Sequence, residues 1–173
     1  MELLKAHGVQ AVADVRLIPK SRRYPHFNDQ EMGRWLPAAG IEYLSMKDLG
    51  GRRRPLKDSI NTAWRNESFR GYADYMQGEK FAAALETLIK EARKRPTAIM
   101  CAEAVPWRCH RSLIGDALLA RGWRVVDLLS ATKTQEHRLT DFAKIDGTRV
   151  TYPGEQTLFD QTTRATSSSP PHP

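Results

Sequence analysis

Short apolar runs alternate along the chain with stretches in which apolar residues lie three or four positions apart. Residues 9–16 and 97–101 are short apolar runs next to polar residues, a pattern typical of strands buried in a sheet. Residues 41–45 and 123–129 have the same character. Residues 79–95 instead show the helical spacing of apolar positions, which predicts an amphipathic helix.

The order of these elements predicts an α/β fold. Strand, helix and strand follow one another over residues 97–129, so we expect a βαβ unit with two parallel strands. A helix that opens with a capping box of Asn28 and Glu31 precedes the second strand. We therefore predict a three-layer αβα arrangement around a mostly parallel sheet. Residues 1–160 form a single domain in this interpretation, and residues 161–173, rich in Ser and Pro, form a disordered tail.

The chain is basic, and its charge is unevenly distributed. The formal net charge is +7, with 18 Arg against 9 Lys. Residues 15–57 carry ten of these cations and four acids, a local excess of six. An Arg-rich excess favours phosphate or carboxylate ligands, because guanidinium forms paired hydrogen bonds to oxyanions. An ordinary solvated basic face is the alternative explanation.

Hydropathy and cysteine content restrict the compartment. No run of about 18 apolar residues occurs, so we expect no membrane partner. Two cysteines are too few for a disulfide framework, which favours a reducing compartment, and we expect a cytoplasmic protein.

Residues that could carry chemistry gather where the strand at 97–101 gives way to the next helix. The segment holds two thiols, an imidazole, an acid and two guanidiniums: Cys101, Glu103, Arg108, Cys109, His110 and Arg111. In open α/β sheets, ligands bind at the carboxyl ends of the strands, and a helix N-terminus attracts anions and lowers the pKa of a nearby thiol. Asp14 and Arg16 end the first strand, so they converge on the same edge if the two strands are neighbours.

Three chemistries compete at this edge. The first is a thiolate nucleophile at an anion-binding turn, as in tyrosine phosphatases and rhodaneses, but these require an Arg six residues after the Cys, where this chain has Trp107. The second is a metal ion held by Cys101, Cys109 and His110; two adjacent ligands and the lack of a CxxC pair count against it, so we expect no metal and no cofactor. The third is anion recognition without catalysis, with both cysteines structural.

Several short motifs together resemble one known family. They are Asp14-Val15-Arg16 followed by Pro19 and Ser21, then Phe27, Leu49-Gly50-Gly51-Arg52, Cys101-Ala102-Glu103 and Cys109-His110-Arg111. Over roughly residues 3–130 the chain resembles domain of unknown function family 488. The resemblance implies a small α/β fold without a settled activity, and some members carry a label that relates them to DNA repair. Family members usually begin with a strand before the helix that starts here near Met1, so we expect this chain to lack that strand.

Our leading hypothesis is an enzyme or enzyme-like domain that acts on or binds a phosphate-bearing ligand, such as a nucleotide or nucleic acid. Cys101 is the candidate nucleophile with Cys109 as a second thiol, Glu103 or Asp14 the candidate acid or base, and His110 an orienting or proton-transferring group. The candidate anion-binding residues are Arg16, Ser21, Arg52, Arg108 and Arg111.

The competing hypothesis is a nucleic-acid-binding or scaffolding module without catalysis. In that case Asp14 simply pairs with Arg16, and the cysteines are core residues. The binding surface would then be the remaining cations of the basic segment: Arg22, Arg23, Arg53, Arg54 and Lys57.

Overall fold

The computed structural model describes residues 1–154, and the predicted tail at 161–173 lies outside the described residues. In chain order the elements are α1 (Glu2–Ala6), β1 (Ala11–Asp14), η1 (Pro25–Phe27), α2 (Asp29–Ala38), β2 (Glu42–Ser45), η2 (Lys47–Leu49), α3 (Glu67–Tyr75), α4 (Glu79–Lys94), β3 (Thr97–Met100), η3 (Pro106–Arg108), α5 (Arg111–Leu119), β4 (Val126–Leu128), β5 (Thr134–Glu136), β6 (Lys144–Asp146) and β7 (Arg149–Thr151). Among the described helices, none has the length and apolar character needed to cross a bilayer.

A parallel sheet in the order β2-β1-β3 forms the centre of the molecule. Asp14, the last residue of β1, pairs with Ser45 of β2 and with Met100 of β3. The ladder continues for one more residue, because the Val15 N–H donates to the Met100 carbonyl at 3.0 Å. All three strands therefore end at one edge of the sheet, and β1 and β3 are neighbours, as the convergence of their polar ends requires.

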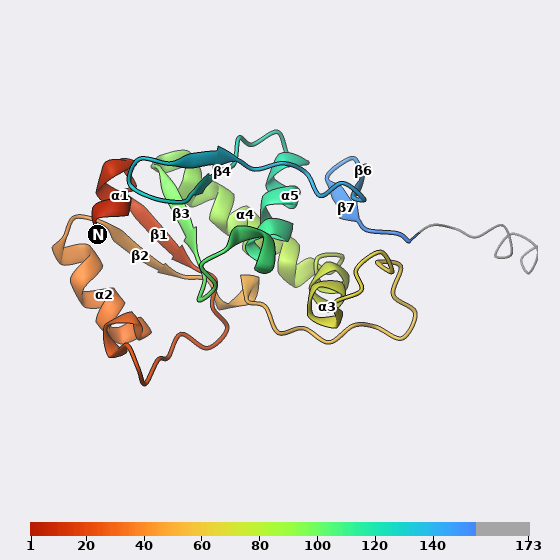
Figure 1. The fold of residues 1–173 in the computed structure, drawn as a ribbon, viewed down its shortest axis with the longest axis horizontal. Helices are drawn as coiled ribbons and strands as arrows, with labels where there is room; N and C mark the ends of the chain where they lie inside the picture. Colours follow the sequence, from red (N-terminus) through yellow and green to blue (C-terminus); the bar gives the residue numbers. More distant parts are fainter. Residues whose placement is uncertain (155–173) are drawn as a thin grey trace, which may run out of the picture.

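Helices cover both faces of this sheet, and Figure 1 shows α2 on one side with α4 and α5 on the other. Val12 of β1 packs in a cluster with Met32 and Leu36 of α2. The next residue, Ala13, points to the opposite face and belongs to the cluster that contains Leu85 of α4 and Leu113 of α5. The alternation of side chains along β1 thus separates two helical layers, which confirms the predicted α/β fold.

The predicted βαβ unit over residues 97–129 is wrong in its last strand. β4 pairs antiparallel with β5, with Val126 opposite Glu136, and in the described part of the chain the parallel sheet ends at β3. Leu128 of β4 still packs against the same apolar cluster as Met100 of β3. β5 follows β4 after a short loop, so pairing the two as a hairpin costs less loop-closure entropy than pairing β4 with the parallel sheet through a crossover. The apolar pattern of residues 123–129 does not reveal this partner.

The start of α2 also differs from the prediction. Asn28 is the N-cap residue, but its side chain makes no hydrogen bond to the helix. Its Oδ1 instead accepts the N–H of Ser21 at 2.6 Å, and Glu31 pairs with Arg34 at 3.0 Å. The loop between β1 and α2 therefore uses the side chain that a capping box would need.

A buried carboxylate attaches the C-terminal part of the described chain to α5. Asp116 is fully buried, and its Oδ1 lies 3.0 Å from Nε2 of His137. Its Oδ2 accepts the hydroxyl of Tyr152 at 2.8 Å. The pKa of His137 is raised, mainly because of its hydrogen bond to Asp116, although burial acts in the opposite direction.

Candidate functional site

A cleft of about 260 Å³ opens at the edge where β1 and β3 end. We call it the edge cleft. Its polar lining consists of Arg16, Arg52, Ser68, Glu103 and Arg108, and its remaining lining consists of Cys101, Cys109 and His110 together with Leu17, Ile18, Gly51, Phe69 and Ala102. The structure therefore brings most of the sequence-predicted site residues to one cavity.

Cys101, Cys109 and His110 form a compact group in the cleft, which we call the Cys–Cys–His cluster. Nδ1 of His110 lies 3.9 Å from Sγ of Cys101 and 3.7 Å from Sγ of Cys109. The two sulfur atoms and an imidazole nitrogen all lie within 4.8 Å of one another. Cys109 is only 2% exposed, whereas Cys101 is partly exposed.

Three contacts fix the ring of His110. Its Nε2 lies 3.3 Å from the carbonyl oxygen of Val15, so an Nε2–H donates to the backbone and Nδ1 faces the two sulfurs. Tyr72 packs against the ring with a centroid distance of 4.9 Å. A Cβ on Gly51 would lie 2.9 Å from Nδ1, so only glycine leaves room for the ring at this position. Gly51 of the sequence motif thus provides the space that the His110 ring occupies.

The backbone and one guanidinium act on the two sulfurs. The backbone at Glu103 acts to lower the pKa of Cys101, and that at Arg111 acts to lower the pKa of Cys109. The Nε of Arg111 also lies 3.4 Å from Sγ of Cys109, and its Nη2 donates to the carbonyl of Glu103. Arg111, a candidate anion ligand, is therefore engaged in holding the thiol-bearing loop and does not line the edge cleft.

The two thiols share a proton unequally. The pKa of Cys101 is lowered, chiefly because of its hydrogen bond with Cys109 and secondarily because of its contact with His110 and the backbone at Glu103, although burial acts to raise it. The pKa of Cys109 is raised by the same hydrogen bond and by burial. The cluster therefore favours one thiolate, at Cys101, where the cleft is accessible.

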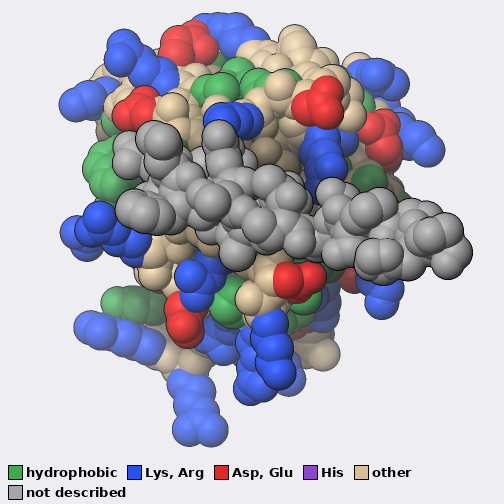
Figure 2. Space-filling model, turned by 90° about the vertical axis from the view of Figure 1, so that its right-hand side faces the viewer, with side chains coloured by type: hydrophobic (Ala, Val, Ile, Leu, Met, Phe, Trp, Pro, Cys, Tyr) green, Lys and Arg blue, Asp and Glu red, His purple; other side chains and the backbone are tan. Residues whose placement is uncertain are grey.

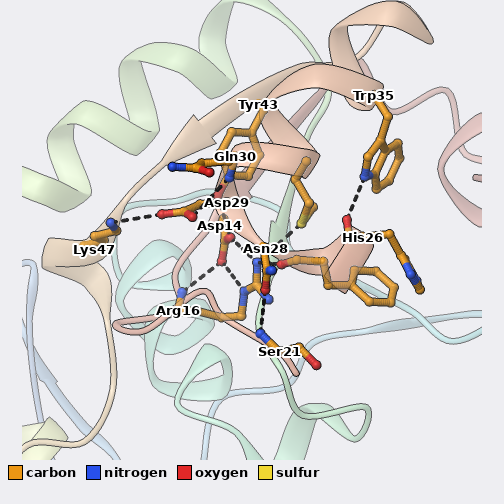
Figure 3. A network of polar contacts seen from close by, with 12 residues as sticks. Asp14, Arg16, Ser21, His26, Asn28, Asp29, Gln30, Trp35, Tyr43 and Lys47 are labelled. Atoms are coloured by element: carbon orange, nitrogen blue, oxygen red, sulfur yellow. Dashed lines mark hydrogen bonds and ion pairs between the residues drawn. The ribbon is translucent and has the colours of Figure 1, made fainter. Parts of the chain in front are cut away.

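Asp14 and Arg16 form a buried ion pair, shown in Figure 3. Nη2 and Nε of Arg16 donate to the Asp14 carboxylate at 2.6 and 2.8 Å, and Tyr43 donates its hydroxyl at 2.8 Å. Nη2 also donates to the carbonyl of Phe27 at 2.8 Å. Asp14 is 1% exposed and is not among the residues that line the edge cleft, whereas Arg16 reaches it.

The other predicted residues divide between cleft and scaffold. The Ser21 hydroxyl accepts the N–H of Tyr24 at 3.0 Å, and Ser21 does not line the cleft. Arg52 and Arg108 are exposed at the cleft, and no hydrogen bond or ion pair of their side chains occurs among the described residues. Glu103 is the acid that lines the cleft, and it is exposed.

Sequence reasoning missed the residues that shape the walls of the cleft. Leu17 and Ile18 are exposed apolar residues that follow the Asp14–Arg16 pair directly, and Phe69 comes from α3. Tyr72, which packs on His110, was visible only as part of the apolar stripe of α3. The signal that could have found the first two was two large apolar side chains in a loop between a strand and a proline, where burial is not expected.

Other cations of the basic segment are partly engaged. Arg53 donates to the carbonyl of Gly50 at 3.0 Å and lies over the ring of Tyr75 at 3.8 Å, so it packs the loop that carries Arg52. Arg54 and Lys57 are exposed. On the face drawn in Figure 2, basic side chains project from several parts of the surface with acidic ones between them. That face therefore does not show one continuous basic patch.

Fold and site together define the class of protein. It is an α/β domain whose parallel sheet carries two thiols, an imidazole and several guanidiniums around one cleft at the carboxyl ends of its strands. The chain belongs to the family described as domain of unknown function DUF488, whose model matches residues 1–118. This confirms the resemblance seen in the sequence motifs, all of which fall inside the match. No curated protein and no solved structure matches the chain.

Proposed function

We propose that the edge cleft binds a phosphate-bearing ligand, a nucleotide or the end of a nucleic acid, and acts on it with the Cys–Cys–His cluster. The observation that supports this is that Arg16, Arg52 and Arg108 line the same cleft as the cluster. Guanidinium and phosphate match in charge and in the spacing of two parallel hydrogen bonds. We also propose that the protein resides in a reducing compartment such as the cytoplasm, because chemistry at the cleft requires that Cys101 and Cys109 remain free thiols.

The size and walls of the edge cleft favour a small charged group with an apolar attachment. A volume of about 260 Å³ is below the roughly 300–1,000 Å³ of pockets that enclose a whole drug-sized molecule. A phosphate fits, and a sugar or base would remain at the mouth. Leu17 and Ile18, 37% and 57% exposed, line the cleft and offer apolar contacts to that remainder.

The backbone at Arg52 supports a ligand-binding role for this side chain. Its φ of 61° lies in the left-handed region, which costs a non-glycine residue about 1–2 kcal/mol. The two residues before it, Gly50 and Gly51, are glycines, but this position is an arginine. A guanidinium kept at a position that favours glycine is explained if the side chain has a function at the cleft.

The proposal is tested by calorimetric titration with inorganic phosphate, a nucleoside 5′-monophosphate and the matching nucleoside. We expect the monophosphate to bind and the nucleoside to bind far more weakly. Arg52→Ala and Arg108→Ala each lose a charged hydrogen-bonded contact of about 1.5–3 kcal/mol, so affinity falls about 10- to 100-fold. Arg93→Ala is the matched control, because Arg93 is exposed in the last turn of α4, at the opposite edge of the sheet. Equal losses in all three variants would refute the cleft as the binding site.

Nucleic-acid binding without catalysis is the second candidate, supported by the exposed Arg54 and Lys57 and by the local excess of positive charge. In that case affinity for duplex DNA falls with salt with a log–log slope of about −0.9 per phosphate contact. The double variant Arg54→Ala/Lys57→Ala would then weaken binding, while Cys101→Ser would leave it unchanged. The reverse pattern with a short phosphorylated ligand supports the edge cleft.

A further inference from the structure

We propose that the Cys–Cys–His cluster is a metal site that binds one Zn²⁺ through Sγ of Cys101, Sγ of Cys109 and Nδ1 of His110, with the fourth coordination position facing the edge cleft. This deepens the proposed function and rests on the same cavity, because it places an ion in the wall where the phosphate would bind. Two thiolates and one neutral imidazole are ligands that zinc prefers. All three residues line the cleft.

The distances fit a tetrahedral ion. Zn–S bonds of about 2.3 Å and Zn–N bonds of about 2.0 Å place S and N about 3.5 Å apart and two sulfurs about 3.8 Å apart in a regular tetrahedron. The structure has S···N distances of 3.9 Å for Cys101 and 3.7 Å for Cys109, and every pair of ligand atoms lies within 4.8 Å. The two S···N distances are therefore within a few tenths of an ångström of those in a tetrahedral site.

The imidazole is oriented for this role. Its Nε2 is committed to the Val15 carbonyl, and such a backbone contact on the far nitrogen is the usual support of a metal-bound histidine. The glycine above it leaves the bonding direction open. A Cβ on Gly51 would lie 2.9 Å from Nδ1 and equally far, 3.3 Å, from Cε1 and Cγ. That position is over the ring face, so the lone pair of Nδ1, which lies in the ring plane, is not blocked by Gly51.

The sulfur of Cys109 has a charged hydrogen-bond donor beside it. Nε of the Arg111 guanidinium lies 3.4 Å from Sγ of Cys109, and Nη2 of the same side chain donates to the carbonyl of Glu103. Outer contacts of this kind orient first-coordination ligands and balance their charge. Two thiolates and a divalent cation sum to zero charge, so the arginines of the cleft keep their attraction for phosphate.

Three protein ligands with an open position distinguish reactive zinc sites from closed, four-ligand structural ones. In the edge cleft, the open position would take a water molecule or an oxygen of the bound phosphate. Arg16, Arg52 and Arg108 would then hold the other phosphate oxygens.

The test is titration of the reduced full chain with Co²⁺ alone, followed by Zn²⁺ alone. We expect one equivalent of Co²⁺ with the visible absorption of a tetrahedral ion and a thiolate-to-cobalt charge-transfer band, both lost on adding Zn²⁺, which binds more tightly. Cys101→Ser and His110→Ala weaken Co²⁺ binding more than about 100-fold. The control His26→Ala, an exposed histidine outside the cleft lining, leaves it unchanged. A wild-type chain that binds no Co²⁺, or a spectrum unchanged in His110→Ala, overturns the proposal.

Gly51→Ala keeps all three ligands and tests their geometry. The added methyl group displaces the ring, so we expect Co²⁺ affinity to fall about 10- to 100-fold with the circular dichroism of a folded chain retained. This variant and the wild-type stoichiometry decide the question even if a ligand variant fails to fold; unchanged Co²⁺ affinity in Gly51→Ala contradicts the proposal. Phosphate titration of the metal-free chain separates the two proposals. Phosphate binding without Co²⁺ binding refutes the metal site alone, and Co²⁺ binding without phosphate binding refutes the proposed ligand alone.

Discussion

Removal of the Asp14 carboxylate should destabilise the whole sheet edge on which the cleft is built. Asp14→Ala leaves the guanidinium of Arg16 buried, with a side-chain exposure of 9%, and with the Phe27 carbonyl and the Met32 sulfur as its remaining contacts. The same change takes from Tyr43 the acceptor of its hydroxyl. Because the buried charge keeps its desolvation cost and loses its counter-charge, the loss exceeds that of any exposed ion pair.

The magnitude follows from burial on both sides of the pair. Breaking a buried ion pair by deleting one partner costs about 3–5 kcal/mol, and the partly buried Tyr43 adds about 1 kcal/mol at most. With a urea m-value of about 2 kcal/mol per molar, the unfolding midpoint should fall by about 2 M. The double variant Asp14→Ala/Arg16→Met also removes the stranded charge, so it should be more stable than Asp14→Ala alone.

Urea denaturation followed by circular dichroism measures all these free energies of unfolding. Glu31→Ala is the control, because its ion pair with Arg34 has side-chain exposures of 45% and 75%, and such surface pairs contribute less than about 1 kcal/mol. If Asp14→Ala costs no more than Glu31→Ala, or if the double variant is less stable than the single one, the buried-pair argument is wrong.

Three further outcomes follow from the described contacts. The folded-state pKa of His137 lies above 6.5 because of its hydrogen bond to Asp116, so the stabilising contribution of the protonated imidazole is complete below about pH 6.5 and is lost as pH rises through the folded-state pKa. The difference in unfolding free energy between wild type and His137→Gln should therefore shrink from about pH 5 to about pH 8, and a constant difference contradicts this. Gly71→Ala should lower the free energy of unfolding by about 3 kcal/mol, because its Cβ would lie 2.3 Å from a backbone oxygen of the loop before α3. Gly33→Ala, with 3.7 Å of clearance inside α2, should instead raise the free energy of unfolding by about 0.5–1 kcal/mol. Urea denaturation measures both variants, and equal effects refute the steric argument. Arg52→Gly should be about 1 kcal/mol more stable than Arg52→Ala, and both should lose phosphate affinity equally in calorimetry; a less stable glycine variant would refute backbone strain at φ 61°.

Hydrophobic periodicity was sufficient for the elements that build the parallel sheet. The three apolar runs that became β1, β2 and β3 are short and bounded by polar residues, and a run of this kind in a three-layer fold has no other place than the interior. The helix predicted at 79–95 begins and ends within one residue of α4, because its apolar stripe is long and regular.

Pairing and side-chain use could not be predicted in the same way. The run that became β4 is apolar like the others, and only the position of β5 decides that it forms a hairpin. Asn28 has the residue type of a helix cap, yet a loop residue seven positions earlier uses its side-chain oxygen. In both cases a local pattern competes with a partner that lies outside the window from which the pattern is read.

The Cys–Cys–His cluster shows the same limit at the site itself. Adjacent residues of a strand are unsuited to bind one ion, because in a strand Cys109 and His110 would point to opposite faces. Here Cys109 is extended, with φ −129° and ψ 144°, whereas His110 is helical, with φ −56° and ψ −11°. The change of backbone conformation at the start of α5 turns both side chains toward the end of β3, where Cys101 lies. A spacing rule derived from regular structure therefore fails where a strand-like residue meets a helix, and a contiguous Cys-His pair is compatible with a shared ligand at that junction.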